Sequence, residues 1–187
     1  MKKIFVITLI GLTLIIQAYG QTNSKVQTDD KAGKICKNEI YRFSATIPSS
    51  WKLYGQIIND TINHVAIADW GLPKVYSELE QTEIENSISI IAYQRRDINS
   101  IDELIQFEWT RYKRNGPTAE IVMEVDKTSP DARIINITEP TGIKYRGKLY
   151  FVYQNGIGYV VTFMATPGTY EKNIKVFEEF YENVKLD

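Results

Sequence analysis

The sequence is poor in the residues on which several kinds of chemistry depend. Among its 187 residues it has one cysteine, Cys36, and one histidine, His64. A single cysteine can form no disulfide within the chain, so the fold must be stabilised by packing. The sequence has no HxH or HExxH zinc pattern, no GxSxG nucleophile elbow, and no GxxxxGK or GxGxxG phosphate loop. We therefore expect no catalytic, metal or cofactor site and interpret the protein as a non-enzyme.

The sequence also lacks an excess of charge of either sign. The chain has 22 basic and 23 acidic residues, and its lysines and arginines are scattered among the acids. Proteins that neutralise several phosphates normally carry a basic face. This charge balance argues against a nucleic-acid partner.

Long hydrophobic runs are absent except at the start. Lys2 and Lys3 precede an uncharged stretch over 4–16, and Ala18 and Gly20 lie three and one positions before Gln21. This pattern is typical of a cleaved signal peptide, and the run is shorter than the roughly 20 residues that a membrane anchor needs. We therefore expect a signal peptide over 1–20, export to the bacterial periplasm or the extracellular space, and no membrane span after cleavage.

The remainder is predicted to form a polar leader and one domain. Residues 21–32 are polar and without periodicity, which predicts a flexible leader. From residue 33 to 187 the patterns are those of a single domain. Alternating or β-rich segments predict strands at 41–47, 64–70, 86–93, 119–125, 133–138 and 145–165. The last of these contains Asn155-Gly156, a strong signal for a two-residue hairpin turn.

Two segments are predicted to be helical. Ser100 followed three residues later by Glu103 indicates a capping box, and Asn115-Gly116-Pro117 ends that helix. A second helix is predicted over 169–184, where five apolar residues recur at helical spacing: Tyr170, Ile174, Phe177, Tyr181 and Val184. Since crossover helices between most strands are missing, the order favours an α+β fold with one mainly antiparallel sheet of about six to eight strands, flanked by helices.

The chain resembles a known superfamily in two places. The pattern Y-x-F-x-x-x-x-P-x-x-W runs from Tyr41 to Trp51, and the hairpin LYFVYQNGIGYVVTFMA is followed by the helix YEKNIKVFEEFYENVKL. These pieces, within 40–51 and 145–186, look like the PsbP-like superfamily, which includes the photosystem II extrinsic subunits, the Mog-type proteins and small bacterial envelope proteins of unassigned role. The resemblance implies an antiparallel sheet between helices, and it implies little about chemistry because a shared fold does not carry function with it.

The three tryptophans are candidates for recognition or for the core. Trp51 follows Pro48 and is predicted to fold back over the sheet edge as part of the core. Trp70, beside Gly71, is predicted to be a surface aromatic available for recognition. For Trp109 the sequence leaves core and surface open.

The remaining candidates are charged or reactive side chains. Arg95 and Arg96 form an exposed basic pair that we include with Trp70 in a surface for recognition. His64 is interpreted as a surface strand residue and Cys36 as a half-buried apolar one. Residues 74–85 are predicted to be a loop with one helical turn, and their acidic run, Glu78, Glu80, Glu83 and Glu85, is interpreted as a solvated face.

Three functions from different classes remain open at this stage. The first is a non-enzymatic envelope protein that binds or stabilises another protein. The second is a carrier for a small apolar ligand or lipid, suggested by 12 tyrosines, 7 phenylalanines and 3 tryptophans. The third is a hydrolase that uses His64. The absence of catalytic motifs favours the first.

Overall fold

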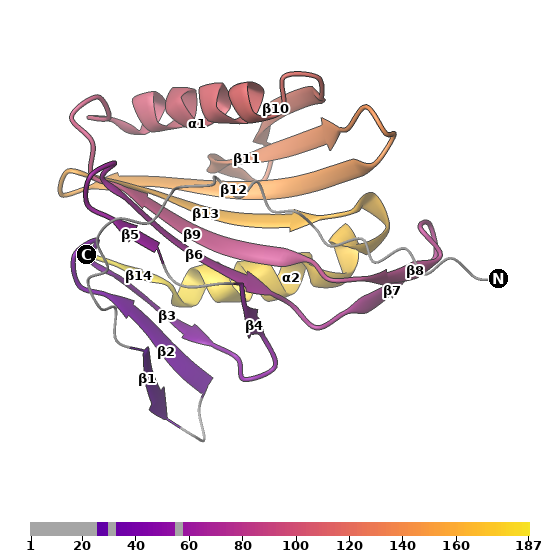
Figure 1. The fold of residues 1–187 in the computed structure, drawn as a ribbon, viewed down its shortest axis with the longest axis horizontal. Coiled ribbons are helices and arrows are strands. Elements are labelled where there is room, and N and C mark those ends of the chain that lie inside the picture. Colours follow the sequence, from indigo (N-terminus) through magenta and orange to yellow (C-terminus); the bar gives the residue numbers. More distant parts are fainter. Residues whose placement is uncertain (1–25, 30–32, 55–57) are drawn as a thin grey trace.

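The chain is built around a large antiparallel sheet. In this computed structural model the described residues are 26–29, 33–54 and 58–187, so the expected signal peptide over 1–20 lies outside them. Eight strands form the large sheet: β4 (Lys52–Leu53), β5 (Ile58–Asp60), β6 (Val65–Gly71), β9 (Ser87–Tyr93), β10 (Glu120–Asp126), β11 (Ser129–Thr138), β12 (Lys144–Gln154) and β13 (Ile157–Ala165). Their order is β10-β11-β12-β13-β9-β6-β4, and β5 also pairs with β6 (Figure 1).

The central hairpin of this sheet forms as the sequence predicts. Asn155 and Gly156 have φ angles of 52° and 77°, the positive values that the two central residues of a type I′ turn require. They join β12 to β13, which pair from Gln154 with Ile157 to Arg146 with Ala165. The predicted strands at 64–70, 86–93 and 119–125 are β6, β9 and β10.

A second sheet corrects the expectation of one sheet alone. Four strands form it in the order β1-β2-β3-β14: β1 (Val26–Asp29), β2 (Gly33–Asn38), β3 (Phe43–Ile47) and β14 (Lys185–Leu186). The strand predicted at 41–47 therefore does not join the large sheet, because its partners are the N-terminal β2 and the C-terminal β14. β1, inside the expected leader, pairs antiparallel with β2, so this part of the leader has regular structure.

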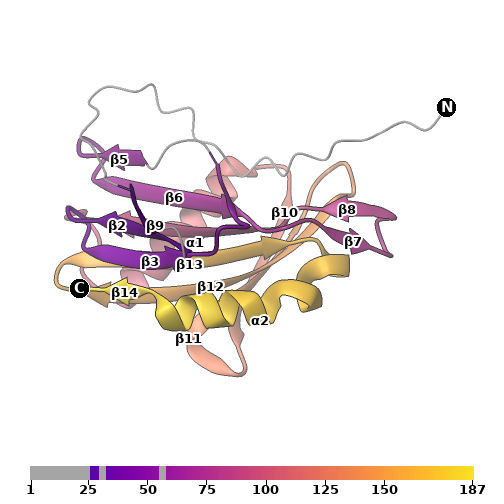
Figure 2. The ribbon, with the colours of Figure 1, turned by 90° about the horizontal axis from the view of Figure 1, so that it is seen from below.

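The two helices lie on opposite faces of the large sheet (Figures 1 and 2). Along β13 the side chains alternate: Tyr159 and Phe163 belong to the core on the side of α2 (Pro167–Asn183), whereas Val160 belongs to the core on the side of α1 (Ile101–Asn115). The small sheet shares the α2 side, where Phe43 joins the same core. This arrangement explains why nearly every residue of β13 is buried, since a sheet covered on both faces has no solvated side.

The α1 core contains one buried ion pair. The Glu108 carboxylate, whose residue is fully buried, accepts a hydrogen bond from the Tyr93 hydroxyl at 2.5 Å and paired bonds from the Arg111 guanidinium at 2.9 and 2.6 Å. Burial raises the pKa of Tyr93, and the negative charge of Glu108 raises it further. The carboxylate is therefore compensated inside an otherwise apolar layer.

The helix starts differ in how their backbone N–H groups are satisfied. At α1 the Ser100 hydroxyl accepts from the Glu103 N–H at 3.1 Å, and the Glu103 carboxylate accepts from the Asn99 N–H at 2.6 Å, so the predicted cap is confirmed with a shift of one residue in its second half. At α2 the N-cap side chain makes no such bond. Its place is taken by Glu80, which accepts from the Gly168 N–H at 3.4 Å.

Candidate functional site

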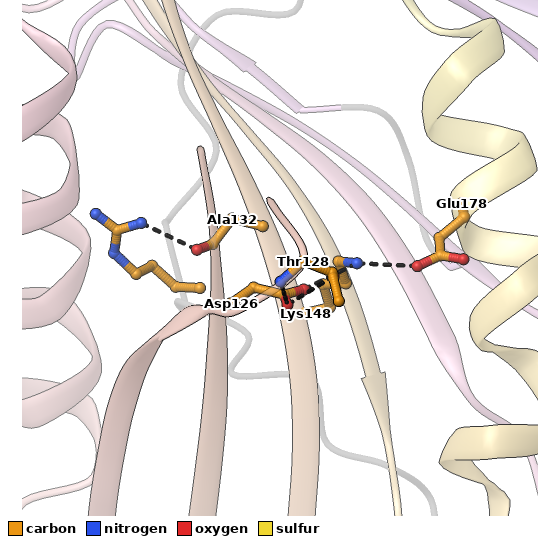
Figure 3. Close-up of polar contacts among 6 residues, drawn as sticks. Asp126, Thr128, Ala132, Lys148 and Glu178 are labelled. Atoms are coloured by element: carbon orange, nitrogen blue, oxygen red, sulfur yellow. Dashed lines mark hydrogen bonds and ion pairs between the residues drawn. The ribbon is translucent and has the colours of Figure 1, made fainter. Parts of the chain in front are cut away.

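The most buried cation of the α2 side joins that helix to the large sheet. Lys148, on β12, places its Nζ atom 2.9 Å from Oδ2 of Asp126 and 2.9 Å from Oε1 of Glu178 on α2 (Figure 3). The lysine and aspartate side chains are 5% and 10% exposed, and that of Glu178 is 42% exposed. The Thr128 N–H and hydroxyl each donate to Asp126 Oδ1 at 2.8 Å.

These contacts fix the protonation states of the buried pair. Burial alone would lower the pKa of Lys148, but its hydrogen bonds to Glu178 and Asp126 raise it above the usual value. Burial would likewise raise the pKa of Asp126, yet hydrogen bonds from Thr128 and Lys148 bring it below the usual value. A permanently protonated lysine is no base or nucleophile, so this network has a structural role.

A second polar group lies on the opposite face of the sheet, the one that α1 covers in part. Asp69, Ser89 and Thr162 are paired in register across β6, β9 and β13. Each lies two residues from a side chain of the α1 core on the same strand, and residues two apart on a strand share a face, so all three face the α1 side. Oδ1 of Asp69 and Oγ1 of Thr162 are buried without a hydrogen-bond partner among the described residues. Burial raises the pKa of Asp69 to about 7, although the Trp70 N–H opposes this shift.

Two further ionisable side chains lie next to Asp69, Ser89 and Thr162. The Tyr54 hydroxyl donates to the Glu85 carboxylate, and both groups lie over Gly71, where an added Cβ would meet them. Burial raises the pKa of Tyr54, with further contributions from Glu85 and from the Asp69 charge. We call these five residues the polar row: Asp69, Ser89, Thr162, Tyr54 and Glu85. The Asp69 carboxyl is the group in this row that can change charge near neutral pH.

The raised pKa of Asp69 predicts an unusual effect of substitution. The pKa of Asp69 is about 7 in the folded protein, compared with a reference value of 3.8. The charged carboxylate therefore destabilises the fold most above pH 7, and this destabilisation is relieved as pH falls towards 3.8 and the buried group is protonated. We expect Asp69→Asn to raise the free energy of unfolding by roughly 1–3 kcal/mol at pH 8 and to change it little at pH 4. Urea unfolding at both pH values measures this. The exposed Asp131→Asn serves as the control, and a destabilised Asp69→Asn variant at pH 8 would contradict the assignment.

Residues 74–85 form a hairpin, which corrects the predicted loop. β7 (Val75–Ser77) pairs with β8 (Thr82–Ile84), and the hairpin projects beyond the end of the large sheet in both views (Figures 1 and 2). Periodicity could not reveal strands of three residues each. Near its turn Tyr76 is 48% and Leu79 is 70% exposed.

The acidic run in this hairpin is divided among three environments. Glu78 and Glu83 are exposed, Glu80 caps α2, and Glu85 accepts from Tyr54. The interpretation as a solvated face therefore holds for two of the four side chains. Within 26–29, 33–54 and 58–187 no group of three or more histidine, cysteine, aspartate or glutamate side chains is placed to hold a metal ion.

Trp70 is wrongly predicted as a surface residue. It is 3% exposed and packs edge-on against Phe180 of α2 with ring centroids 6.0 Å apart. The reason is that β6 continues through Gly71, so alternation turns Trp70 towards the α2 core. Trp51 packs against the same Phe180 at 5.3 Å and is half-buried, which agrees with its predicted place at the core.

The other predicted residues are dispersed over the surface. Trp109 is half-buried on α1, with the Lys113 ammonium 4.4 Å from its ring. Arg95 is held by Asp97 through bonds of 2.8 and 2.9 Å, whereas Arg96 is exposed. With Trp70 in the core, the predicted surface of Trp70, Arg95 and Arg96 does not form.

The two lone reactive side chains lie apart. His64 is exposed as predicted, but it lies in the turn before β6 and not in the strand, with a φ of 54°. Cys36 is 3% exposed, and burial raises the pKa of its thiol to about 11, so it is an apolar residue as predicted but is buried in the core instead of half-buried. No helix in the part of the chain described by the structure is both long and apolar enough to cross a bilayer.

Comparison with known proteins gives structural likeness only. No family model and no curated protein matches the chain. A crystal structure from Bacteroides thetaiotaomicron VPI-5482 is 16% identical with a TM-score of 0.44, covering 83% of this chain and 49% of that one, so the chain spans about half the length of that protein. The solution structure of cyanobacterial PsbP (CyanoP) from Synechocystis sp. PCC 6803 is 7% identical with a TM-score of 0.48, covering 92% of this chain and 99% of that one. CyanoP carries the name of the superfamily that the sequence resembles, but at these scores neither structure assigns a family or function, and the likeness to Mog-type and envelope proteins stays a prediction.

Proposed function

We propose that the protein is an exported, non-enzymatic protein that binds a partner protein in the bacterial cell envelope through the β7–β8 hairpin. The observation that carries this proposal is Leu79, an aliphatic side chain that is 70% exposed in the turn of a projecting hairpin. A large apolar side chain presented on a loop is a common anchor of recognition.

The hairpin is fixed to the body of the protein by specific contacts. The Lys172 ammonium of α2 donates to the Tyr76 carbonyl at 2.7 Å. Glu80 accepts from the Ser77 hydroxyl and from the Gly168 N–H. A loop already held in one conformation loses less entropy on binding, which favours recognition by this segment.

The side chains around Leu79 define the chemistry of the partner. Tyr76 adds a half-exposed aromatic ring, and Glu78 and Glu83 add two exposed carboxylates. A complementary surface has an apolar pocket with basic residues at its rim. The alternative of a carrier for a small apolar ligand stays a prediction.

Two matched substitutions test the proposal. Leu79→Ser removes the anchor, and Ile62→Ser changes a second side chain that is also 70% exposed but lies in the β5–β6 turn. Affinity isolation of the tagged protein from its native envelope should recover a partner with wild type and with Ile62→Ser, and at least tenfold less with Leu79→Ser. Failure to recover a reproducible partner, or equal recovery with both variants, would overturn the proposal.

A further inference from the structure

Three buried hydrogen-bond donors on α2 or on the sheet face that it covers have no partner among the described residues. They are Nε of Arg146, Nδ2 of Asn86 and Nδ2 of Asn173. Asn86 is fully buried and Asn173 is 7% exposed. Since a buried polar group without a hydrogen-bond partner destabilises the fold, three donors in one region suggest a common acceptor.

The strand register places two of these donors on either side of Ala165. Arg146 on β12 pairs with Ala165 on β13. On the other side of β13, Met164 pairs with Ser87, so the antiparallel register brings Asn86 opposite Ala165. The side chain of Ala165, the residue between them on β13, is a single methyl group.

The third donor comes from the helix that covers this position. Asn173 lies one turn after Thr169, whose hydroxyl donates to Oδ1 of Asn86 at 2.8 Å. It also lies three residues after Tyr170, and the Arg146 guanidinium stacks over that ring at 4.4 Å. Residues three and four apart share one side of a helix, so Asn173 lies on the side of α2 that carries the contacts to Asn86 and Arg146.

The chemistry of the three groups selects the kind of ligand. All three atoms donate, and Oδ1 of Asn86 is already occupied by the Thr169 hydroxyl. Arg146 forms no ion pair with a described carboxylate, in contrast to Lys148, Arg95 and Arg111. A guanidinium stacked on an aromatic ring and flanked by amide donors suits the planar or tetrahedral oxygens of an oxyanion.

We propose that Arg146, Asn86 and Asn173 form a binding site for a small oxyanion, a carboxylate or a phosphate group. This site is independent of the hairpin surface, since it lies between α2 and the large sheet and uses none of the hairpin's exposed residues. Its occupant supplies the acceptor oxygens that the three donors lack.

Thermal unfolding with added anions tests the site in the purified protein. Sodium phosphate, sodium acetate and sodium chloride are compared at equal ionic strength. We expect phosphate or acetate to raise Tm along a saturable curve, by roughly 5–10 °C at a hundredfold excess over its Kd. The arm that saturates identifies the phosphate or the carboxylate as the ligand group, and isothermal titration calorimetry with that anion gives a second measure of binding.

Matched variants separate a specific site from a general salt effect. Arg146→Gln removes the charge at the site, whereas Arg96→Gln removes the same charge at an exposed position. We expect the saturable shift to persist in Arg96→Gln and to fall at least fivefold in Arg146→Gln, and Asn173→Leu provides a second test if the first variant does not fold. A shift that is equal in these variants, that never saturates, or that appears with chloride alone would overturn the proposal, because salts that are excluded from protein surfaces stabilise without binding.

Discussion

Replacing Lys148 by methionine should lower the free energy of unfolding by about 3–5 kcal/mol, the usual cost of removing one partner from a buried ion pair. The variant leaves the Asp126 carboxylate, 10% exposed, without the ammonium group that lies 2.9 Å from it. It also removes the contact to Glu178 that holds α2 to β12. Denaturation in urea at pH 7 measures the loss.

The pH dependence of this loss identifies its cause. Lys148 contributes to lowering the folded pKa of Asp126, so the stability that depends on the lysine is lost as pH falls and Asp126 is protonated, and the destabilisation by Lys148→Met should shrink. The double variant Lys148→Met with Asp126→Asn should recover part of the stability at pH 7. Lys175→Met, at an exposed position of α2, is the control; an equal loss in it would refute the role of the buried pair.

Truncating Phe177 to alanine should cost about 3–5 kcal/mol, because it opens a cavity between α2 and the large sheet. Phe177 is fully buried, and its ring lies 5.5 Å from that of Phe163 and 5.8 Å from that of Tyr150. The neighbouring Val176 is 37% exposed, so Val176→Ala should change stability by no more than about 0.5 kcal/mol.

Chemical unfolding of both variants provides the comparison. A similar m-value for wild type and Phe177→Ala would show that the same surface is exposed on unfolding and that the difference lies in stability. If the two alanine variants were equally stable, the packing of α2 on this face would be wrong.

The strongest local signals in the sequence predict the centre of the fold. Asn155-Gly156 predicts the β12–β13 hairpin because few dipeptides accept positive φ at both positions. Ser100 and Gly116 bound α1 as expected. These features depend on the backbone preferences of one or two residues. Such preferences can be recognised in the sequence without knowledge of the tertiary structure.

Features set by distant partners could not be predicted in the same way. Ser129-Pro130-Asp131 has the composition of a turn, yet the strand β11 begins at Ser129, with a register irregularity opposite at Asp126. Trp70 is next to Gly71 and Pro73, which suggested a strand exit, but pairing with β9 extends β6 through Gly71. In both cases tertiary pairing overrides local turn chemistry.

The buried polar side chains were missed for a related reason. Arg146 and Lys148 share a face of β12 and alternate with Gly147 and Leu149, a pattern typical of a strand with one solvated face. That face is instead covered by α2, which buries Lys148 beneath Glu178. A signal does exist, since the strong β-formers Tyr150, Phe151 and Val152 follow the lysine closely, but only the position of the helix shows which carboxylates accompany it.

The pairing of β14 with β3 joins parts of the chain that are far apart in sequence. Leu186 lies opposite Phe43, and the Asp187 N–H donates to the Arg42 carbonyl at 2.9 Å. β3 consequently keeps one edge without its backbone partner until Lys185 and Leu186 have been synthesised. A nascent chain that stops before β14 would present that edge to other molecules, so the arrival of β14 also protects β3 from edge-to-edge aggregation.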